Sequence, residues 1–285
     1  MIQSILNALQ YGFMQNALLA GILVSIACGV IGTYVVIKRV VFISGGIAHA
    51  AYGGIGLGYY LGIHPTLGAV IFSLLAAFGM GAVQRKTQQR ADTVIGAMWA
   101  IGMAVGIIFL DLTPGYKADL MSYLFGSILA VPRSDLLMMV ALNLVIILLV
   151  VLFYKELLAI SFDEDFSTVE NVPVGAMYMV LLGMIGLTVV MMMRVVGLIM
   201  VIALLTLPAA ISAQFVRQMK AMMVLSSLLG MVFTTLGLFL SYFFNLTSGA
   251  TIILVAGVAY LLSLIWRALA NRFARRPALA TEKEG

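Results

Sequence analysis

The chain has 285 residues, of which 63% are hydrophobic and only 9% are charged, and its formal net charge is +5 at pH 7. Because soluble domains carry about 25% charged residues, this composition excludes a water-soluble globular protein and predicts an all-α integral membrane protein. The positive balance does not indicate nucleic-acid binding, since the lysines and arginines lie in short clusters between apolar runs, as they do in the loops of membrane proteins.

Apolar runs of about 20 residues, long enough to cross a membrane, follow one another along the chain, so residues 1–285 are predicted to form a single transmembrane domain. The first span is predicted at 12–37, and the others lie near 41–62, 65–84, 92–111, 134–154, 173–193, 195–215, 221–244 and 249–268. Neighbouring runs nearly touch at 37–41 and at 193–195, which leaves the number of transmembrane helices at eight or nine. Basic residues concentrate in cytoplasmic loops, and this rule puts the clusters at 38–39, 85–90 and 217–220 and the tail at 269–285 in the cytoplasm.

The second run contains a glycine-rich stretch, SGGIAHAAYGGIGLGYYLG, at residues 44–62. On a helix, small residues at every fourth position form one stripe, which consists of Gly46, Ala50, Gly54, Gly58 and Gly62. Small residues at this spacing let helices approach closely within a bilayer. The stripe therefore predicts tight packing of this helix against its neighbours.

His49, one of only two histidines in the chain, lies in the middle of this stretch. An ionisable residue within a span usually faces the interior of the bundle and often marks a substrate path. Three roles stay open for it: a neutral histidine hydrogen-bonded to a neighbouring helix, a transition-metal ligand or a proton carrier. The other histidine, His64, precedes Pro65 at a turn and is interpreted as an ordinary loop residue.

Two connections are longer than simple turns. Residues 112–133 contain an apolar stretch that is too short to span, which is typical of an extracytoplasmic loop with a short helix or a re-entrant segment. Residues 155–172, on the cytoplasmic side, carry five acidic residues against a single lysine. A loop of this composition is either a solvated linker or a docking surface for another protein.

No stretch between the spans is long enough to fold as a catalytic domain, and the phosphate-binding pattern GxxxxGKS/T is absent from the chain. The chain is therefore predicted to contain no soluble catalytic domain. If ATP drives transport, another chain must bind it.

Five segments together resemble the membrane permease of bacterial ABC importers for zinc, manganese and iron, the ABC-3 family. The similarity covers nearly the whole chain, and the segments lie in the family's order at 41–62, 118–131, 162–174, 193–216 and 240–264. Two of them bear on function. VFISGGIAHAAYGGIGLGYYLG (41–62) is similar to the span that carries the family's histidine, and FDEDFSTVENVPV (162–174) is similar to the loop that docks on the ATPase.

The resemblance implies a permease with the type II ABC importer architecture in the bacterial cytoplasmic (inner) membrane. It would form a homodimer, or a dimer of close paralogues, on two ATP-binding cassette ATPase subunits, with an extracytoplasmic metal-binding protein delivering the ion. The implied substrate is a divalent metal ion, with no permanently bound cofactor and with ATP used only through the partner subunit. Within the chain, the resemblance implies a substrate path at His49, Ser44 and Gly45, with His49 as the metal ligand. It also implies that 155–172 is the ATPase-coupling loop, with its contacts at Phe162, Asp163, Glu164, Asp165 and Phe166.

One departure from the family concerns the position four residues before His49. Family members commonly have Asp there, so that the acid and the histidine share a helix face, but this chain has Gly45. A histidine without its carboxylate is a softer environment, which favours zinc over manganese or iron. Together with the resemblance, this predicts an ATP-driven importer of a divalent transition metal that works by alternating access, with zinc preferred and manganese or iron also open. The alternative is a proton-coupled secondary transporter with His49 as its proton site.

Overall fold

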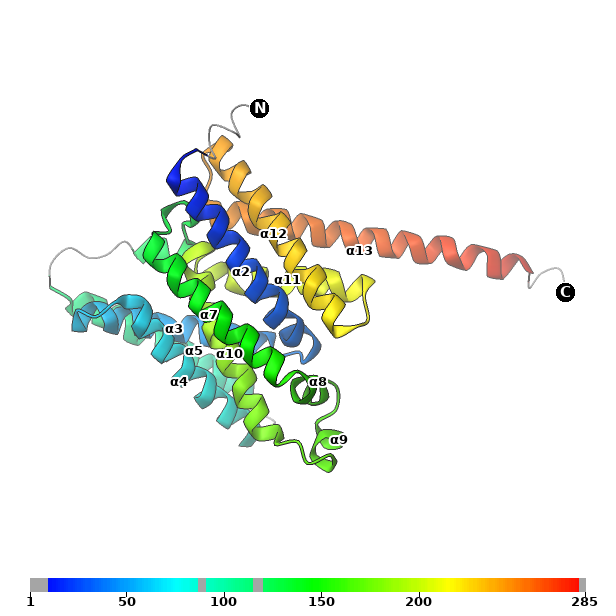
Figure 1. Cartoon of the computed structure of the whole chain (residues 1–285), viewed down its shortest axis with the longest axis horizontal. Helices are drawn as coiled ribbons and strands as arrows, with labels where there is room; N and C mark the ends of the chain where they lie inside the picture. The colour runs from blue at the N-terminus through cyan, green and yellow to red at the C-terminus, as the bar shows by residue number, and fades with distance from the viewer. Residues whose placement is uncertain (1–9, 87–90, 115–119, 282–285) are drawn as a thin grey trace.

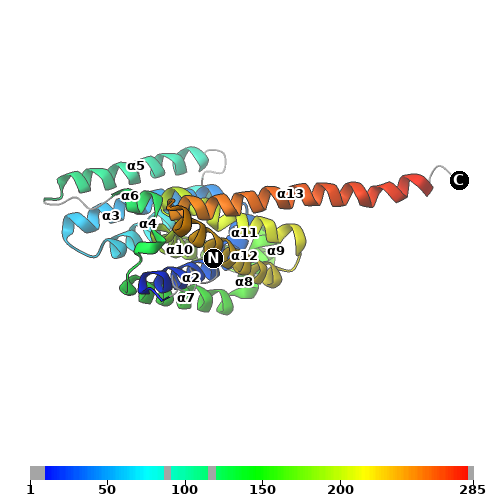
Figure 2. The ribbon, with the colours of Figure 1, turned by 90° about the horizontal axis from the view of Figure 1, so that it is seen from above.

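The computed structural model describes residues 10–86, 91–114 and 120–281, which form an all-helical bundle (Figures 1 and 2). The α-helices are α2 (Gly12–Ile37), α3 (Val41–Leu61), α4 (Pro65–Lys86), α5 (Ala91–Leu112), α6 (Leu120–Phe125), α7 (Arg133–Leu152), α8 (Tyr154–Phe162), α9 (Glu164–Val169), α10 (Val174–Val195), α11 (Val201–Phe215), α12 (Met219–Phe244) and α13 (Ser248–Thr281). Two 3₁₀ helices, η1 (Ile128–Ala130) and η2 (Leu198–Met200), precede α7 and α11.

Nine helices of the described part of the chain are long and apolar enough to cross a membrane. The sequence left the number of transmembrane helices at eight or nine. The structure separates the two pairs of apolar runs that nearly touch, at 37–41 and at 193–195. Arg39 has a φ of 58° between α2 and α3, and Gly197 has a φ of 79° between α10 and η2. A residue in the left-handed region cannot continue a right-handed helix, so each pair of runs forms two spans.

The bundle surrounds three largely buried spans, α2, α3 and α10, whereas α5 and α13 leave most of their length exposed. Figure 2 shows α5 on one side of the molecule and α7 with α2 on the other. Residues 269–281, predicted as part of the tail, continue α13 as a helix that projects beyond the bundle (Figure 1). Residues 282–285 lie outside the described part of the chain.

Glycines let α3 pack closely on both α4 and α5. A Cβ atom at Gly54 would lie 2.1 Å from the backbone oxygen of Gly68 in α4, and one at Gly56 would lie 2.1 Å from the backbone oxygen of Gly106 in α5. The predicted packing role is therefore confirmed, although the close contacts occupy two faces of the helix instead of one stripe. Gly62 has a different role, because it ends α3 with a φ of 69° and no atom lies within 4 Å of its Cβ position.

Replacing Gly54 by alanine is expected to lower the thermal unfolding temperature of the protein, because the new methyl group would overlap the carbonyl of Gly68. Overpacking a dense interior typically costs about 1–3 kcal/mol, and a clash with backbone is hard to relieve by a rotamer change. The matched control is Gly96→Ala in α5, where a Cβ atom would meet nothing within 4 Å. Equal unfolding temperatures for the two variants would contradict the close approach of α3 and α4.

The segment between α5 and α7 folds back onto the bundle. The short helix predicted within 112–133 is confirmed as α6, and residues 115–119 lie outside the described ranges. Gly126, with a φ of 71°, turns the chain against Gly197, so that a Cβ atom on either glycine would lie 2.3 Å from the backbone of the other. The hydroxyl of Ser248 accepts the N–H of Ile128 at 3.3 Å. These contacts join the segment to the starts of η2 and α13.

Candidate functional site

His49 lies in the middle of α3 and its ring lies against α5. The residue is half-buried, and its imidazole stacks on the indole of Trp99, with ring centroids 4.1 Å apart and ring planes 23° from parallel. Its Nδ1 atom lies 3.0 Å from the sulfur of Met103, one helical turn after Trp99. The imidazole therefore meets an aromatic face and a thioether, both supplied by α5.

The contact with Met103 favours one tautomer of the neutral imidazole. A thioether sulfur can accept a hydrogen bond but cannot donate one, so the bond requires Nδ1 to carry the proton. Nε2 is then the unprotonated nitrogen, and its lone pair is free to coordinate a transition metal. Metal-ligating histidines are commonly oriented by a hydrogen bond from their other ring nitrogen. In this tautomer, the neutral His49 has one unprotonated ring nitrogen, Nε2.

Gly45 shares the face of α3 that carries His49, one turn earlier, and this position is closely covered. A Cβ atom there would lie 2.6 Å from Cδ1 of Ile202 in α11 and 3.8 Å from the indole of Trp99. The space that a carboxylate would need is therefore occupied by the end of the Ile202 side chain. An acid could enter this position only if that side chain moved.

Ser44 does not join His49 in the structure. It is fully buried, and its hydroxyl donates to the carbonyl oxygen of Val41 at 2.7 Å. His49 follows Ser44 by five residues, so the two side chains leave the helix axis in directions about 140° apart. Of the three predicted path residues, Gly45 and His49 therefore share a face, and Ser44 lies on another.

Trp99 and Met103 are the site residues that sequence reasoning missed. Their spacing of four residues puts them on one face of α5, a pattern visible in the sequence, but nothing in it indicates that this face meets His49. Within the described residues, no three side chains of His, Cys, Asp or Glu come together as a metal site. The arrangement is therefore a single imidazole with soft and aromatic neighbours instead of a closed metal centre.

The predicted coupling loop at 155–172 folds into two short helices, α8 and α9. Asp163 separates them, and its carboxylate accepts the backbone N–H of Phe166 at 2.9 Å. This is the hydrogen bond of a helix N-cap. Glu164 and Asp165 follow in the first turn of α9, where negative charge is favoured by the helix dipole. Three of the five acids thus help to form α9.

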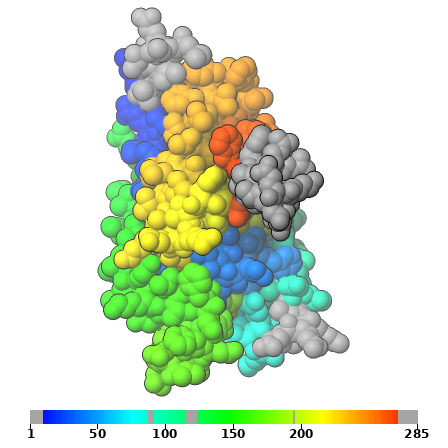
Figure 3. Space-filling view, turned by 90° about the vertical axis from the view of Figure 1, so that its right-hand side faces the viewer, coloured from blue at the N-terminus to red at the C-terminus, as the bar shows by residue number. Residues whose placement is uncertain are grey.

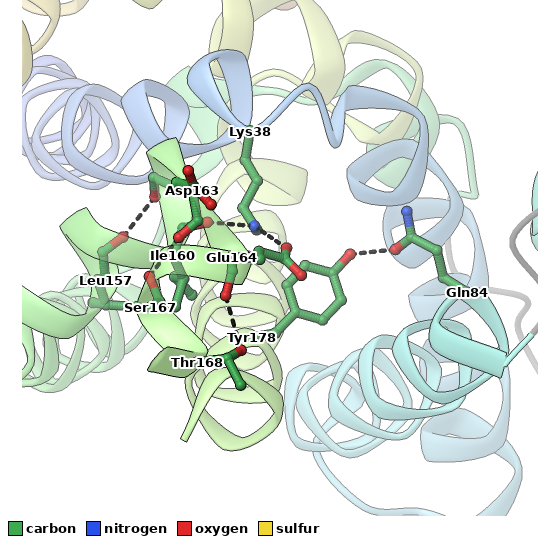
Figure 4. Close-up of polar contacts among 10 residues, drawn as sticks. Lys38, Gln84, Leu157, Ile160, Asp163, Glu164, Ser167, Thr168 and Tyr178 are labelled. Carbon is green, nitrogen blue, oxygen red and sulfur yellow. Dashed lines mark hydrogen bonds and ion pairs between the residues drawn. The ribbon is translucent and has the colours of Figure 1, made fainter. Parts of the chain in front are cut away.

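Lys38, just after the end of α2, anchors α8 and α9 to the bundle (Figure 4). Its ammonium group donates to the carbonyl oxygen of Ile160 at 2.6 Å and forms an ion pair with Glu164. It also lies 5.4 Å from the ring centroid of Tyr178 in α10, whose hydroxyl donates to the side-chain oxygen of Gln84 in α4. These contacts join α2, α4, α8, α9 and α10.

Other contacts extend this junction into what we call the basic end of the bundle. Lys220 at the start of α12 lies 4.9 Å from the ring centroid of Tyr154 in α8, and a Cβ atom at Gly175 would meet the guanidinium group of Arg85. Figure 3 looks onto this end and shows the α2–α3 turn in blue, the α8–α9 segment in green and the α11–α12 turn in yellow. The contacts of Lys38, Arg85 and Lys220 thus bring the three predicted basic clusters to one end of the bundle. The described residues of these clusters are Lys38, Arg39, Arg85, Lys86, Arg217 and Lys220.

The outer surface of α8 and α9 combines exposed apolar and acidic side chains. Phe162 is 67% exposed and Phe166 is 60% exposed, and Asp163, Glu164 and Asp165 are also exposed. This segment lies outside the candidate membrane spans of the described chain. Aromatic side chains among charges are typical of a protein-binding surface. The structure therefore brings all five predicted coupling residues to one exposed segment.

Comparisons with known proteins match the whole bundle. The model of the ABC 3 transport family matches residues 10–267. An uncharacterized membrane protein of Synechocystis sp. is 62% identical and aligns over 94% of this chain and 95% of its own. The manganese transport system membrane protein MntC of Listeria monocytogenes is 35% identical and aligns over 90% of this chain and 92% of its own.

A solved structure has the same fold. In the structure described as PsaBC from Streptococcus pneumoniae in complex with Fab, the similar chain is 34% identical and superposes with a TM-score of 0.85. The superposition covers 92% of this chain and 95% of that chain. The match to the family model at residues 10–267 includes the spans that carry His49 and Trp99 and the segment that forms α8 and α9.

Proposed function

Because this chain belongs to the ABC 3 transport family, whose model matches residues 10–267, we propose that it is the transmembrane permease subunit of an ATP-driven importer for a divalent transition metal, with zinc preferred over manganese and iron. The ion would cross the bacterial cytoplasmic (inner) membrane by alternating access. The chain is a transport subunit and not an enzyme, so ATP would be hydrolysed by a separate ATP-binding cassette subunit. A second copy of the chain would complete the path, and an extracytoplasmic metal-binding protein would deliver the ion.

The observation that carries this proposal is the His49 cluster, defined as His49 with Trp99 and Met103. Imidazole nitrogen and thioether sulfur suit softer metals such as zinc, whereas manganese prefers carboxylate and carbonyl oxygens. Ile202 occupies the space beside Gly45 where a carboxylate would stand, so the cluster lacks the oxygen ligand that manganese would favour. A path needs weak binding, because the ion must leave as well as enter, and a single imidazole from each chain fits that requirement.

The α8–α9 segment would provide the coupling to the ATPase. Its exposed phenylalanines would enter a groove on the partner, and its acids would face basic residues there. Lys38 holds Glu164 and the carbonyl of Ile160 and lies three residues before the start of α3. Closure of the ATPase would therefore move α8 and α9 together with the turn that leads into the helix of His49.

A proton-coupled secondary transporter using His49 is the second function that the sequence allowed. Membership of an ABC transport family does not favour this function. A secondary transporter works without an ATPase, so it would leave the exposed surface of α8 and α9 unexplained. The two functions differ in what drives uptake.

The test is uptake into proteoliposomes that contain this chain and its ATPase. Zinc, manganese and iron are supplied in parallel, with and without ATP and with and without a proton gradient. We expect zinc uptake that requires ATP and is insensitive to a proton ionophore. Uptake that follows the proton gradient without ATP would overturn the proposal, and ATP-driven uptake of manganese in preference to zinc would overturn the metal assignment.

Replacing Gly45 by aspartate is expected to shift uptake from zinc toward manganese by several-fold, because it adds an oxygen ligand one turn before His49. The new side chain would displace Ile202, so the substitution is best made together with Ile202→Ala. The measurement is the ratio of manganese to zinc uptake, and Ile202→Ala alone is the control for the cavity. An unchanged ratio in the double variant would show that position 45 does not take part in metal selection.

A further inference from the structure

A groove opens between α7, α8 and α12 at the basic end of the bundle. Its volume is about 730 Å³, within the range of about 300–1,000 Å³ that is typical of pockets for small organic ligands. Its walls are apolar, and they include Val30 of α2, Ile147 and Val151 of α7, and Val224 of α12. The groove lies on other helices than the His49 cluster, which α3 and α5 form on the other side of the bundle (Figure 2).

The open side of the groove is bordered by exposed apolar side chains of the membrane-spanning helices. The wall residues Val151 and Val224 are 70% and 61% exposed, and Leu152, the last residue of α7, is 64% exposed. Side chains of this kind on the outside of a membrane-spanning helix contact lipid tails. The groove is therefore continuous with a surface that lipid covers.

The rim of the groove is polar and carries a net positive charge. Tyr154, Lys155 and Glu156 of α8 and Lys220 of α12 line it where α7 ends and α12 begins. Lys220 lies against the ring of Tyr154. The only ion pair among the described residues joins Lys38 and Glu164, so neither rim lysine is paired there. Among the residues that line the groove, two lysines stand against one glutamate.

We propose that this groove binds one anionic phospholipid, with an acyl chain along the apolar walls and the phosphate between Lys155 and Lys220. Basic pockets between helices on the cytoplasmic side bind anionic lipid headgroups, because each lysine at headgroup depth attracts negative charge. Tyrosine suits the same depth, since its ring is apolar and its hydroxyl is polar. The bound lipid would connect α12 to α8, and so brace the base of the α8–α9 segment.

The test uses the purified full-length chain in a neutral detergent. Phosphatidylglycerol or phosphatidylcholine with identical acyl chains is added, and native mass spectrometry measures the fraction of protein that retains one lipid. We expect phosphatidylglycerol to bind several-fold more tightly than phosphatidylcholine. Lys155→Gln and Lys220→Gln are each expected to weaken phosphatidylglycerol binding by about fivefold, and to leave phosphatidylcholine binding unchanged.

Two matched controls separate the groove from the general charge of the basic end. Lys86→Gln removes the same charge from an exposed position at this end but outside the groove, and it should bind phosphatidylglycerol like the wild type. Val224→Trp fills the groove and should weaken binding, whereas Val232→Trp on an exposed part of the same helix should not. Equal binding of the two lipids to the wild type would overturn the proposal. So would an equal loss in Lys86→Gln and Lys220→Gln, because the attraction would then be a property of the whole surface.

Discussion

Replacing His49 by alanine is expected to reduce ATP-driven zinc uptake by about 10- to 100-fold, the range that losing an interaction at a metal site typically costs. The substitution removes the imidazole that Trp99 and Met103 orient on α3. Within the described residues, no cluster of three His, Cys, Asp or Glu side chains offers another metal site. The measurement is the initial rate of zinc uptake into proteoliposomes that contain the chain and its ATPase.

The matched control is His64→Ala, because His64 is exposed in the turn between α3 and α4 and its loss should leave uptake unchanged. His49→Cys adds a second arm, since a thiolate binds zinc well but suits manganese poorly. We expect the cysteine variant to recover zinc uptake more than manganese uptake. Normal uptake by a correctly assembled His49→Ala variant would remove this residue from the transport path.

Reversing the charge of Asp165 is expected to reduce zinc uptake by about tenfold or more while ATP hydrolysis by the complex continues. Asp165 is exposed on α9, and a lysine there would oppose basic residues on the ATPase, which typically costs several kcal/mol in an interface. Phe166→Ala should act in the same direction, because it removes the exposed aromatic residue beside it. The measurements are zinc transported per ATP hydrolysed, and retention of the ATPase during purification.

Asp163 needs a different substitution, because its carboxylate caps α9 through the N–H of Phe166. Asn is as good an N-cap as Asp, so Asp163→Asn tests the charge without unfolding the helix. Asp92→Lys at the start of α5 is the control for charge reversal, since that acid is exposed and lies outside α8 and α9. If Asp165→Lys keeps full transport per ATP, α9 is not the coupling surface.

The spans could be predicted from the sequence because crossing a membrane needs about 20 apolar residues whatever the packing. The predicted run at 65–84 is α4 (Pro65–Lys86), and the run at 221–244 is α12 (Met219–Phe244). The choice between eight and nine spans could not be made in this way. It depended on a φ of 58° at Arg39 and of 79° at Gly197, and neither conformation changes the hydropathy of the runs.

The two helices of the 155–172 segment, α8 and α9, could not be predicted from the sequence pattern either. Its composition predicted an acidic connection, but nothing in it distinguished the acid that caps a helix from the acid that pairs with Lys38. That distinction depends on where α2 ends relative to α8, because Lys38 meets Ile160 and Glu164 across more than 120 residues of chain.

The sequence by itself determined that this chain is a membrane-embedded bundle of a metal-transport family, with one histidine among the small residues of its second span. The membrane-embedded bundle follows from local composition, and the family follows from the resemblance of five segments in the same order; neither needs knowledge of packing. Only the tertiary structure decided what surrounds that histidine. Trp99 and Met103 reach it because α3 and α5 approach each other at glycines such as Gly56 and Gly106, and Ile202 of α11 closes the space beside Gly45. Contacts between helices depend on how their faces are turned toward each other, which hydropathy does not specify.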